Sequence, residues 1–167
     1  MQLIQGKPIA DQVLSKVGTL IRSRGITPGL AVILIGNDPA SEMYVGLKER
    51  AARLVGVRFE KHVLPITHTT QEVQTLVREL NHHPRIHGII VQLPLPQSLD
   101  ADAIIATIHP HKDADGFHPQ TVASFLEGTS VIPPVFPRAI RALLESARQP
   151  LQDKRALIFA NSKLFAR

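Results

Sequence analysis

The pair Tyr44 and Lys48 is the first place in this sequence where residue type and spacing suggest chemistry. Residues four apart in a helix share a face, and this pair flanks the apolar stripe of its segment. A lysine at such an edge is partly desolvated, which disfavours its charged form and lets it exchange protons near neutral pH. The alternative is a surface lysine whose stem covers apolar surface beside a tyrosine.

A second polar group follows an apolar run in the sequence VQLPLP, residues 91–96. Gln92 ends the run and precedes two prolines that stiffen the chain. Open α/β sheets bind ligands beyond the carboxyl ends of their strands, so Gln92 could meet Lys48 there. The alternative is that Gln92 satisfies only local backbone groups.

The polar loop HPHKDADGFH concentrates imidazoles and carboxylates: His109, His111, Asp113, Asp115 and His118. One carboxylate could bind an amidine-like pair of N–H groups in a heterocycle through two parallel hydrogen bonds. The same residue types suit a metal, but no spacing such as H-x-x-x-H fixes a geometry. We therefore expect no metal, with metal-dependent hydrolysis as an alternative. The structural interpretation is a solvated loop in which Asp113 caps its neighbours.

Alternating helices and strands must position these polar side chains. Apolar residues at helical spacing predict helices over Pro8–Arg24, from Asp38 or Ser41 to Gly56, and over Thr70–His82. Apolar runs predict strands over Leu30–Ile35, Val57–Leu64 and Gly88–Leu93. Short connections between such elements indicate right-handed crossovers and a parallel sheet. The predicted fold class is α/β, a three-layer open parallel sheet of βαβαβ type.

After residue 100 the pattern changes. Helices are expected over Ala101–Ile108, Gln120–Leu126 and Ala139–Ala147, a hinge at the proline-rich IPPVFP, and a last strand over Arg155–Ala160. That strand has no crossover helix or partner strand after it. We therefore expect one complete domain, residues 1–137, followed over residues 138–167 by a linker helix and the truncated start of a second domain.

Composition narrows the class of protein. A length of 167 residues with 44% hydrophobic content suits one buried core, and neither a secretion signal nor an apolar run of about 18 residues is present. We expect a soluble, cytoplasmic protein that does not bind membranes. The absence of cysteine excludes disulfides and thiolate chemistry. The net charge of +5 favours anionic partners, but the basic residues are scattered and aromatics make up 4%, so no nucleic-acid partner is expected.

Four motifs in order, DPASEMYVGLKE, VQLPLP, HKDADGFHP and a following P-x-x-P, resemble those of the bifunctional methylenetetrahydrofolate dehydrogenase/methenyltetrahydrofolate cyclohydrolase family. The resemblance covers nearly the whole chain. It implies one-carbon folate metabolism, a folate-binding domain, tetrahydrofolate derivatives as substrates, NADP as the family's cofactor, and a homodimer.

The resemblance also implies roles for individual residues. Lys48 matches the lysine that relays protons during hydrolysis of the methenyl bridge, and Gln92 would orient it. Tyr44 matches the tyrosine that stacks on the folate. Asp115 matches the carboxylate that grips the pterin, and Asp113 would be structural. The expected substrate-binding residues are Tyr44, Val91, Gln92, Leu93 and Asp115.

Two regions depart from the family pattern. The family's Pro-Cys-Thr-Pro is here Pro134-Val135-Phe136-Pro137, which is apolar and bulkier. Near the end, RALIFANSKLFA resembles the first strand and phosphate-binding turn of the cofactor domain, with cofactor-binding positions at Ala160, Asn161 and Ser162. Ala160 replaces a glycine and Asn161 an arginine, and only Ser162 matches. A Cβ obstructs the approach of backbone to a pyrophosphate, so we expect that this chain alone does not bind NADP.

The leading interpretation is therefore folate binding with possible cyclohydrolase activity and no autonomous dehydrogenase activity. A truncated, non-catalytic member of the family is one alternative. A polyanion-binding α/β module is another.

Overall fold

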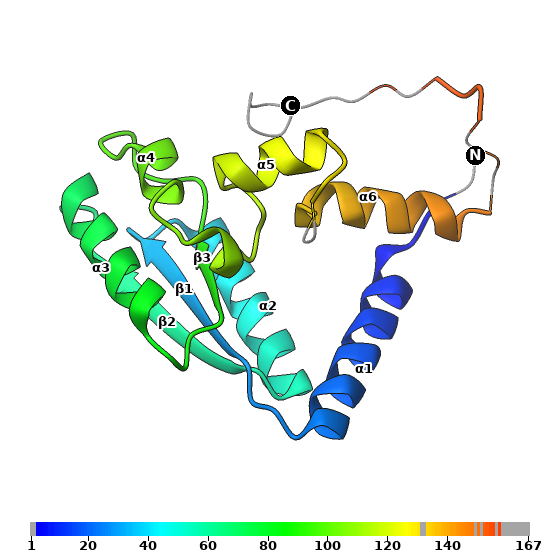
Figure 1. Cartoon of the computed structure of the whole chain (residues 1–167), viewed down its shortest axis with the longest axis horizontal. Coiled ribbons are helices and arrows are strands. Elements are labelled where there is room, and N and C mark those ends of the chain that lie inside the picture. The colour runs from blue at the N-terminus through cyan, green and yellow to red at the C-terminus, as the bar shows by residue number, and fades with distance from the viewer. Residues whose placement is uncertain (1–2, 131–132, 149, 151, 156, 158–167) are drawn as a thin grey trace.

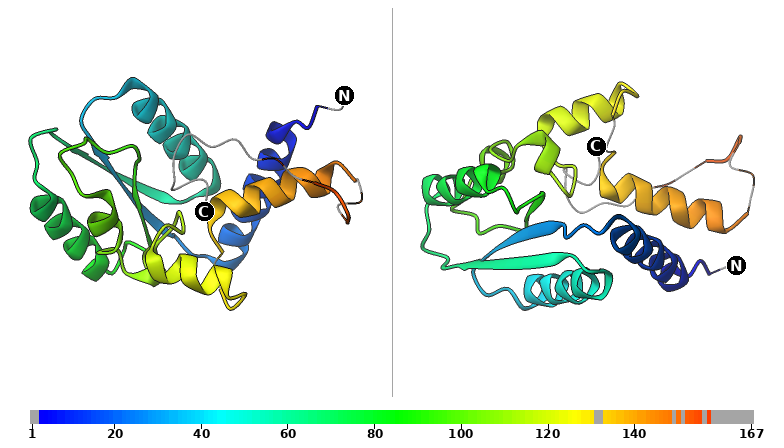
Figure 2. Two further views of the ribbon diagram at one scale, coloured as in Figure 1. Left: turned by 90° about the horizontal axis from the view of Figure 1, so that it is seen from above. Right: turned by 60° about the horizontal axis from the view of Figure 1, so that its bottom comes forward.

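The computed structural model describes residues 3–130, 133–148, 150, 152–155 and 157 (Figure 1). Its centre is a parallel sheet of three strands in the order β2-β1-β3: β1 (Gly29–Ile35), β2 (Arg58–Leu64) and β3 (Gly88–Val91). Helix α2 (Pro39–Val55) joins β1 to β2, and α3 (Thr70–His82) joins β2 to β3. Figure 2 shows these helices on opposite faces of the sheet. The predicted α/β class with a three-layer parallel sheet is confirmed.

The continuous apolar run of β1 is explained by burial on both of its faces. Successive strand residues point to opposite sides, so Ala31 and Ile33 pack into a cluster with Val73 and Val77 of α3. The residues between them, Val32 and Leu34, pack with Val45 of α2. Burying each large aliphatic side chain contributes roughly 1.5–3 kcal/mol. The central strand therefore holds the two helical layers together.

Local signals fix where the crossover helices begin and end. The Asp38 carboxylate accepts a hydrogen bond from the Ser41 amide at 2.7 Å, with Pro39 in the first turn of α2, and Gly56 ends that helix with φ 89°. α3 begins with a capping box between Thr69 and Glu72. These ends place the first half of α2 beside the carboxyl end of β1, where the candidate site lies.

Five further helical segments complete the described fold: α1 (Gly6–Arg24), α4 (Ala101–Ile105), the 3₁₀ helix η1 (Pro110–Lys112), α5 (Pro119–Leu126) and α6 (Val135–Ser146). α1 and α6 contact each other at the side of the α/β body (Figures 1 and 2). None of the helices formed by described residues has the length and apolar character needed to cross a bilayer.

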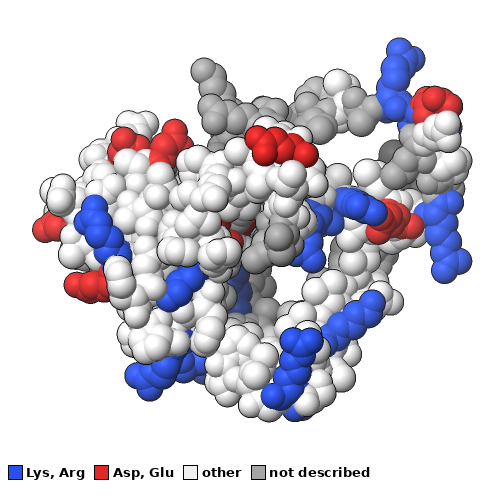
Figure 3. All heavy atoms as spheres, viewed as in Figure 1, with Lys and Arg blue, Asp and Glu red and all other residues white. Residues whose placement is uncertain are grey.

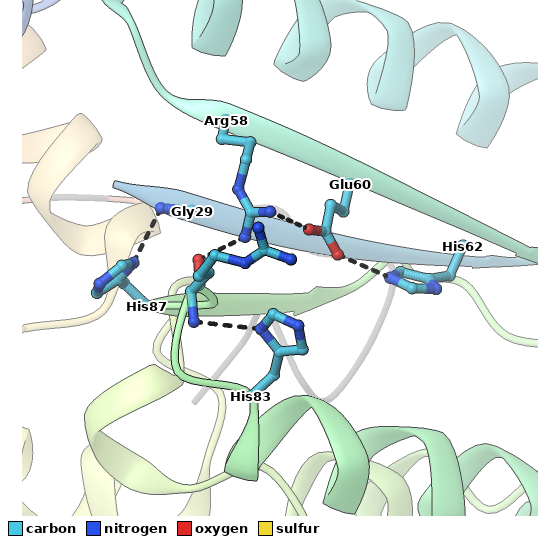
Figure 4. Close-up of polar contacts among 7 residues, drawn as sticks. Gly29, Arg58, Glu60, His62, His83 and His87 are labelled. Atoms are coloured by element: carbon cyan, nitrogen blue, oxygen red, sulfur yellow. Dashed lines mark hydrogen bonds and ion pairs between the residues drawn. The ribbon is translucent and has the colours of Figure 1, made fainter. Parts of the chain in front are cut away.

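A polar cluster closes the amino end of the sheet (Figure 4). The Gly29 amide donates to His87 Nδ1 at 3.0 Å, and Arg58 pairs with Glu60 at 2.8 Å while donating to the Arg85 carbonyl oxygen at 2.8 Å. A Cβ at Gly29 would overlap that carbonyl oxygen, so only glycine fits the start of β1. The cluster joins the strand ends and lies at the opposite end of the sheet from the candidate site.

Several predicted boundaries are corrected. β3 ends at Val91 rather than Leu93, and α4 ends at Ile105 rather than Ile108. The helix expected from Ala139 begins at Val135, so residues 135–137 of the predicted hinge are the first turn of α6. A helix tolerates proline there because the first amides have no acceptor within the helix.

Two expectations at the end of the chain stay predictions. α6 begins before residue 137, the expected boundary between the two domains, and ends after it. The strand expected over Arg155–Ala160 falls mostly outside the described residues.

Candidate functional site

Lys48 and Gln92 meet at the carboxyl end of the sheet. Lys48 Nζ donates to Gln92 Oε1 at 2.7 Å, across 44 positions of sequence. Gln92 Nε2 donates to the Leu93 carbonyl oxygen at 2.7 Å, which turns the amide oxygen towards the lysine. Gln92 therefore meets Lys48 as expected and does not satisfy only local backbone groups, since one end of its amide bonds the backbone and the other binds Lys48. With Gln92 buried and Lys48 half-buried, the contact is partly buried.

Tyr44 lies one helical turn before Lys48 on α2. Tyr44 is 54% exposed, whereas the next residue, Val45, is fully buried. An exposed aromatic ring beside a half-buried amine offers a flat surface on which a heterocycle or aryl ring can stack.

Asp115 lies in a loop held by the hydrogen bonds of its neighbours. The buried Asp113 carboxylate accepts from the Gly116 and His118 amides, both at 2.9 Å, as the capping interpretation predicted. The Ala114 amide donates to Ile89 of β3 at 3.3 Å. The Asp115 backbone is thereby tied to the sheet that also carries Gln92.

The electrostatics of the site couple Asp115 to Lys48. Burial raises the pKa of the Asp115 carboxyl, attraction to Lys48 opposes this change, and repulsion from Asp113 adds to it, with a net upward shift. A partly buried carboxyl near a cation suits recognition of an N–H-rich heterocycle, because the ligand's donors replace the water that the carboxylate has lost. Lys48, Gln92 and Asp115 thus form one electrostatic unit, beside which Tyr44 is exposed.

The other predicted substrate contacts differ in position. The Val91 side chain packs within the core, so any contact that it makes with a ligand must use its backbone. Leu93 is partly buried and lies just beyond the strand. Ala160, Asn161 and Ser162 lie outside the described residues and stay predictions.

The histidines of the polar loop have local structural contacts. His109 and His111 stack with ring centroids 5.4 Å apart, and the His118 ring accepts from the Gln120 amide at the start of α5. Within the part of the chain that the structure describes, no three metal-ligating side chains gather into a site. The geometry thus gives metal-dependent hydrolysis no support.

An apolar groove of about 660 Å³ lies behind the Asp115 loop, between α4, α5 and the start of α6. Phe136, one of the bulky residues of the proline-rich segment, lines it together with Phe117. The Lys48–Gln92 contact does not line this groove. The proline-rich segment is also hydrogen-bonded to the site, since the Val135 amide donates to the Asp115 carbonyl oxygen at 3.2 Å.

Two residues to which the sequence did not point, Asn81 and Lys112, attach the polar loop to the end of α3. Lys112 stands inside the HKDADGFHP motif, whose charge pattern was the available signal. Asn81 carried no signal, because its backbone partners lie 26 and 28 residues away.

Replacing Gly116 by alanine is expected to destabilise the protein. Gly116 has φ 82°, and an added Cβ would lie 2.9 Å from the Pro134 Cβ. Left-handed backbone costs a non-glycine residue about 1–2 kcal/mol, and overpacking adds about 1–3 kcal/mol. Urea unfolding measures the sum. Gly128→Ala is the control, because Gly128 has φ 72° but open space around it. Equal losses in the two variants would contradict the contact with Pro134.

Charge on the molecular surface does not form a single patch on the face that Figure 3 shows. Lys and Arg side chains there are dispersed and mixed with Asp and Glu. This face therefore gives no support to a polyanion-binding module, which needs a continuous basic surface.

Comparison with known proteins gives a consistent assignment. Residues 4–115 match the family described as tetrahydrofolate dehydrogenase/cyclohydrolase, catalytic domain. The chain is 37% identical over 166 residues to the bifunctional protein FolD of Geotalea uraniireducens, covering 98% of this chain and 59% of that protein. It is 41% identical over 161 residues to FolD of Methanosarcina barkeri, covering 96% of this chain and 56% of the relative. The chain thus spans less than two thirds of these relatives.

Solved structures agree with this result. The bifunctional enzyme FolD, a methylenetetrahydrofolate dehydrogenase/cyclohydrolase from Campylobacter jejuni, superposes with a TM-score of 0.83 at 35% identity, over 89% of this chain and 54% of that one. The Trypanosoma brucei dehydrogenase-cyclohydrolase, solved with NADP cofactor and inhibitor, gives 0.76 at 34% identity, over 86% and 50%.

Proposed function

Because this chain belongs to the tetrahydrofolate dehydrogenase/cyclohydrolase family, we propose that it acts in one-carbon folate metabolism, binding tetrahydrofolate derivatives and hydrolysing the methenyl bridge. The observation that carries the proposal is the 2.7 Å contact between Lys48 Nζ and Gln92 Oε1 at the carboxyl end of the sheet. A structural lysine would have no need of a buried amide oriented towards it by a second hydrogen bond.

Two residues near the Lys48–Gln92 contact bind the substrate. The Asp115 carboxylate accepts two hydrogen bonds from adjacent N–H groups of the pterin ring, and the exposed Tyr44 ring stacks against the folate. Attraction to Lys48 opposes the rise that burial causes in the Asp115 pKa, and so favours the ionised form, which can accept both hydrogen bonds. The positively charged methenyl group then lies near Lys48.

The proposed hydrolysis moves protons between water, Lys48 and the nitrogen that is released. Water adds its oxygen to the electrophilic methenyl carbon and loses one proton, after which one carbon–nitrogen bond breaks and the released nitrogen gains a proton. The hydroxyl group of the adduct gives its remaining proton to solvent, and a formyl group remains on the other nitrogen. Lys48 takes the first proton from water and passes it to the departing nitrogen. Gln92 Oε1 holds the amine in place through both transfers.

Dehydrogenase activity is outside this proposal, because it needs NADP and the predicted phosphate-binding turn, residues 160–162, carries alanine where glycine is required. The hydrolysis proposed here needs no nicotinamide. Family resemblance supports two finer proposals, a homodimer and a cytoplasmic location.

The test is the loss of methenyltetrahydrofolate absorbance in a buffer whose uncatalysed rate is low. The purified chain is expected to accelerate the loss in proportion to its concentration. Chelator should leave the rate unchanged, since the mechanism uses no metal. A rate equal to buffer alone, from protein that is folded by circular dichroism, would refute the proposal and favour the non-catalytic alternative.

A further inference from the structure

The carboxyl end of α3 is attached to the loop that leads to Asp115. Asn81, in the last turn of α3, donates through Nδ2 to the Thr107 carbonyl oxygen at 2.7 Å. Its Oδ1 accepts from the His109 amide at 2.9 Å. One side chain thereby satisfies two backbone groups on either side of residue 108, which fixes the path of this loop.

Lys112 makes a second attachment from the loop back to the helix. Its Nζ donates to the Leu80 carbonyl oxygen at 3.2 Å and to the His83 carbonyl oxygen at 3.1 Å. These carbonyls are at the negative end of the helix dipole, where a cation is stabilised. Burial lowers the pKa of Lys112, so the ammonium has given up solvent to make these contacts.

The loop residues that take part in these attachments are close in sequence to Asp115. Lys112 immediately precedes Asp113, whose carboxylate closes the turn that contains Asp115 through the Gly116 and His118 amides. On the other side of the site, Lys48 and Gln92 are fixed by α2 and β3. The position of Asp115 relative to Lys48 therefore depends on the attachments of the loop to α3, together with the backbone hydrogen bonds of Ala114 to Ile89 and of Val135 to Asp115.

We propose that Asn81 and Lys112 are positioning residues that hold Asp115 at its working distance from Lys48. Neither residue touches the Lys48–Gln92 pair, and both act through the backbone between Thr107 and Asp113. The catalytic meaning of the inference rests on the proposed cyclohydrolase function. The placement of Asp115 does not, and it can be measured without folate.

The experiment follows the Asp115 carboxyl by ¹³C NMR through a pH titration in the full chain. In the native protein burial raises the pKa of this carboxyl. Asn81→Leu and Lys112→Met are expected to loosen the loop, admit water and lower the Asp115 pKa towards its ordinary value. Lys112→Arg keeps a donor at the helix end and should restore the native titration. If Asn81→Leu does not fold, Asn81→Asp, which keeps only the acceptor, takes its place.

The matched control is Gln74→Leu. Gln74 Nε2 donates to the Ala103 carbonyl oxygen at 3.1 Å, so this variant also removes a side-chain bond from α3 to the following segment, but one further from Asp115 along the chain. It should leave the Asp115 titration unchanged. An equal shift in Gln74→Leu, or no shift in Asn81→Leu and Lys112→Met, would overturn the inference.

Kinetics separate this inference from the proposed function. If the native chain hydrolyses methenyltetrahydrofolate, kcat/KM should fall about 10- to 100-fold in Asn81→Leu and Lys112→Met, since small misplacements of a binding group are costly. If the native chain is inactive but the NMR pattern appears, the proposed function fails while the positioning of Asp115 stands.

Discussion

Lys48→Ala is expected to remove cyclohydrolase activity, with a fall in kcat of about 100- to 10,000-fold, the range that general acid–base catalysis contributes. The variant deletes the only donor to Gln92 Oε1 that the described structure gives. It also deletes the group proposed to carry the proton between water and the departing nitrogen. Methenyltetrahydrofolate absorbance measures the rate. Lys16→Ala, at an exposed position of α1, is the control and should retain native activity.

Lys48→Arg separates proton transfer from charge. A guanidinium donates hydrogen bonds and keeps a positive charge near Asp115, but it does not lose its proton in proteins. We expect Lys48→Arg to stay folded and to remain at the low rate of Lys48→Ala. Native activity in Lys48→Arg would show that only the charge matters and would contradict the proton relay.

Much of this site could be predicted because its residues follow strong local patterns. The apolar run before Gln92 predicts a buried strand, and the stripe around Lys48 predicts the helix that follows the first strand. Since the carboxyl ends of parallel strands meet at one edge, the 44-residue separation between the two side chains is bridged by topology alone. The capping role of Asp113 is likewise a local property of its loop.

The parts that could not be predicted depend on partners distant in sequence or on competing signals. Lys112 bonds carbonyls 29 and 32 residues away, which no periodicity reveals. The start of α6 at Val135 was obscured by prolines, which mark a loop in most contexts but fit the first turn of a helix. Leu93 was assigned to a strand by its apolar character, although the pairing ends at Val91.

Asp115→Asn is expected to weaken folate binding while making the free protein more stable at neutral pH. The amide offers one acceptor where the carboxylate offers two, so loss of a charge-assisted hydrogen bond of about 1.5–3 kcal/mol predicts affinity about 10- to 150-fold weaker. Fluorescence titration with a folate measures this. Asp11→Asn, at an exposed ion pair with Lys7, is the control and should bind folate normally.

The gain in stability follows from the direction of the Asp115 shift. Burial raises the pKa of this carboxyl in the folded protein, so its contribution to stability is greatest at acid pH and is lost as pH rises through the folded value. At pH 7 the native chain bears the cost of a buried charge that Asp115→Asn removes. Urea unfolding should therefore show a more stable variant at pH 7 and no such advantage below about pH 4, where carboxyls are protonated. A variant less stable than the native chain at pH 7 would mean that Asp115 supports the fold. Its burial could not then be explained by ligand recognition alone.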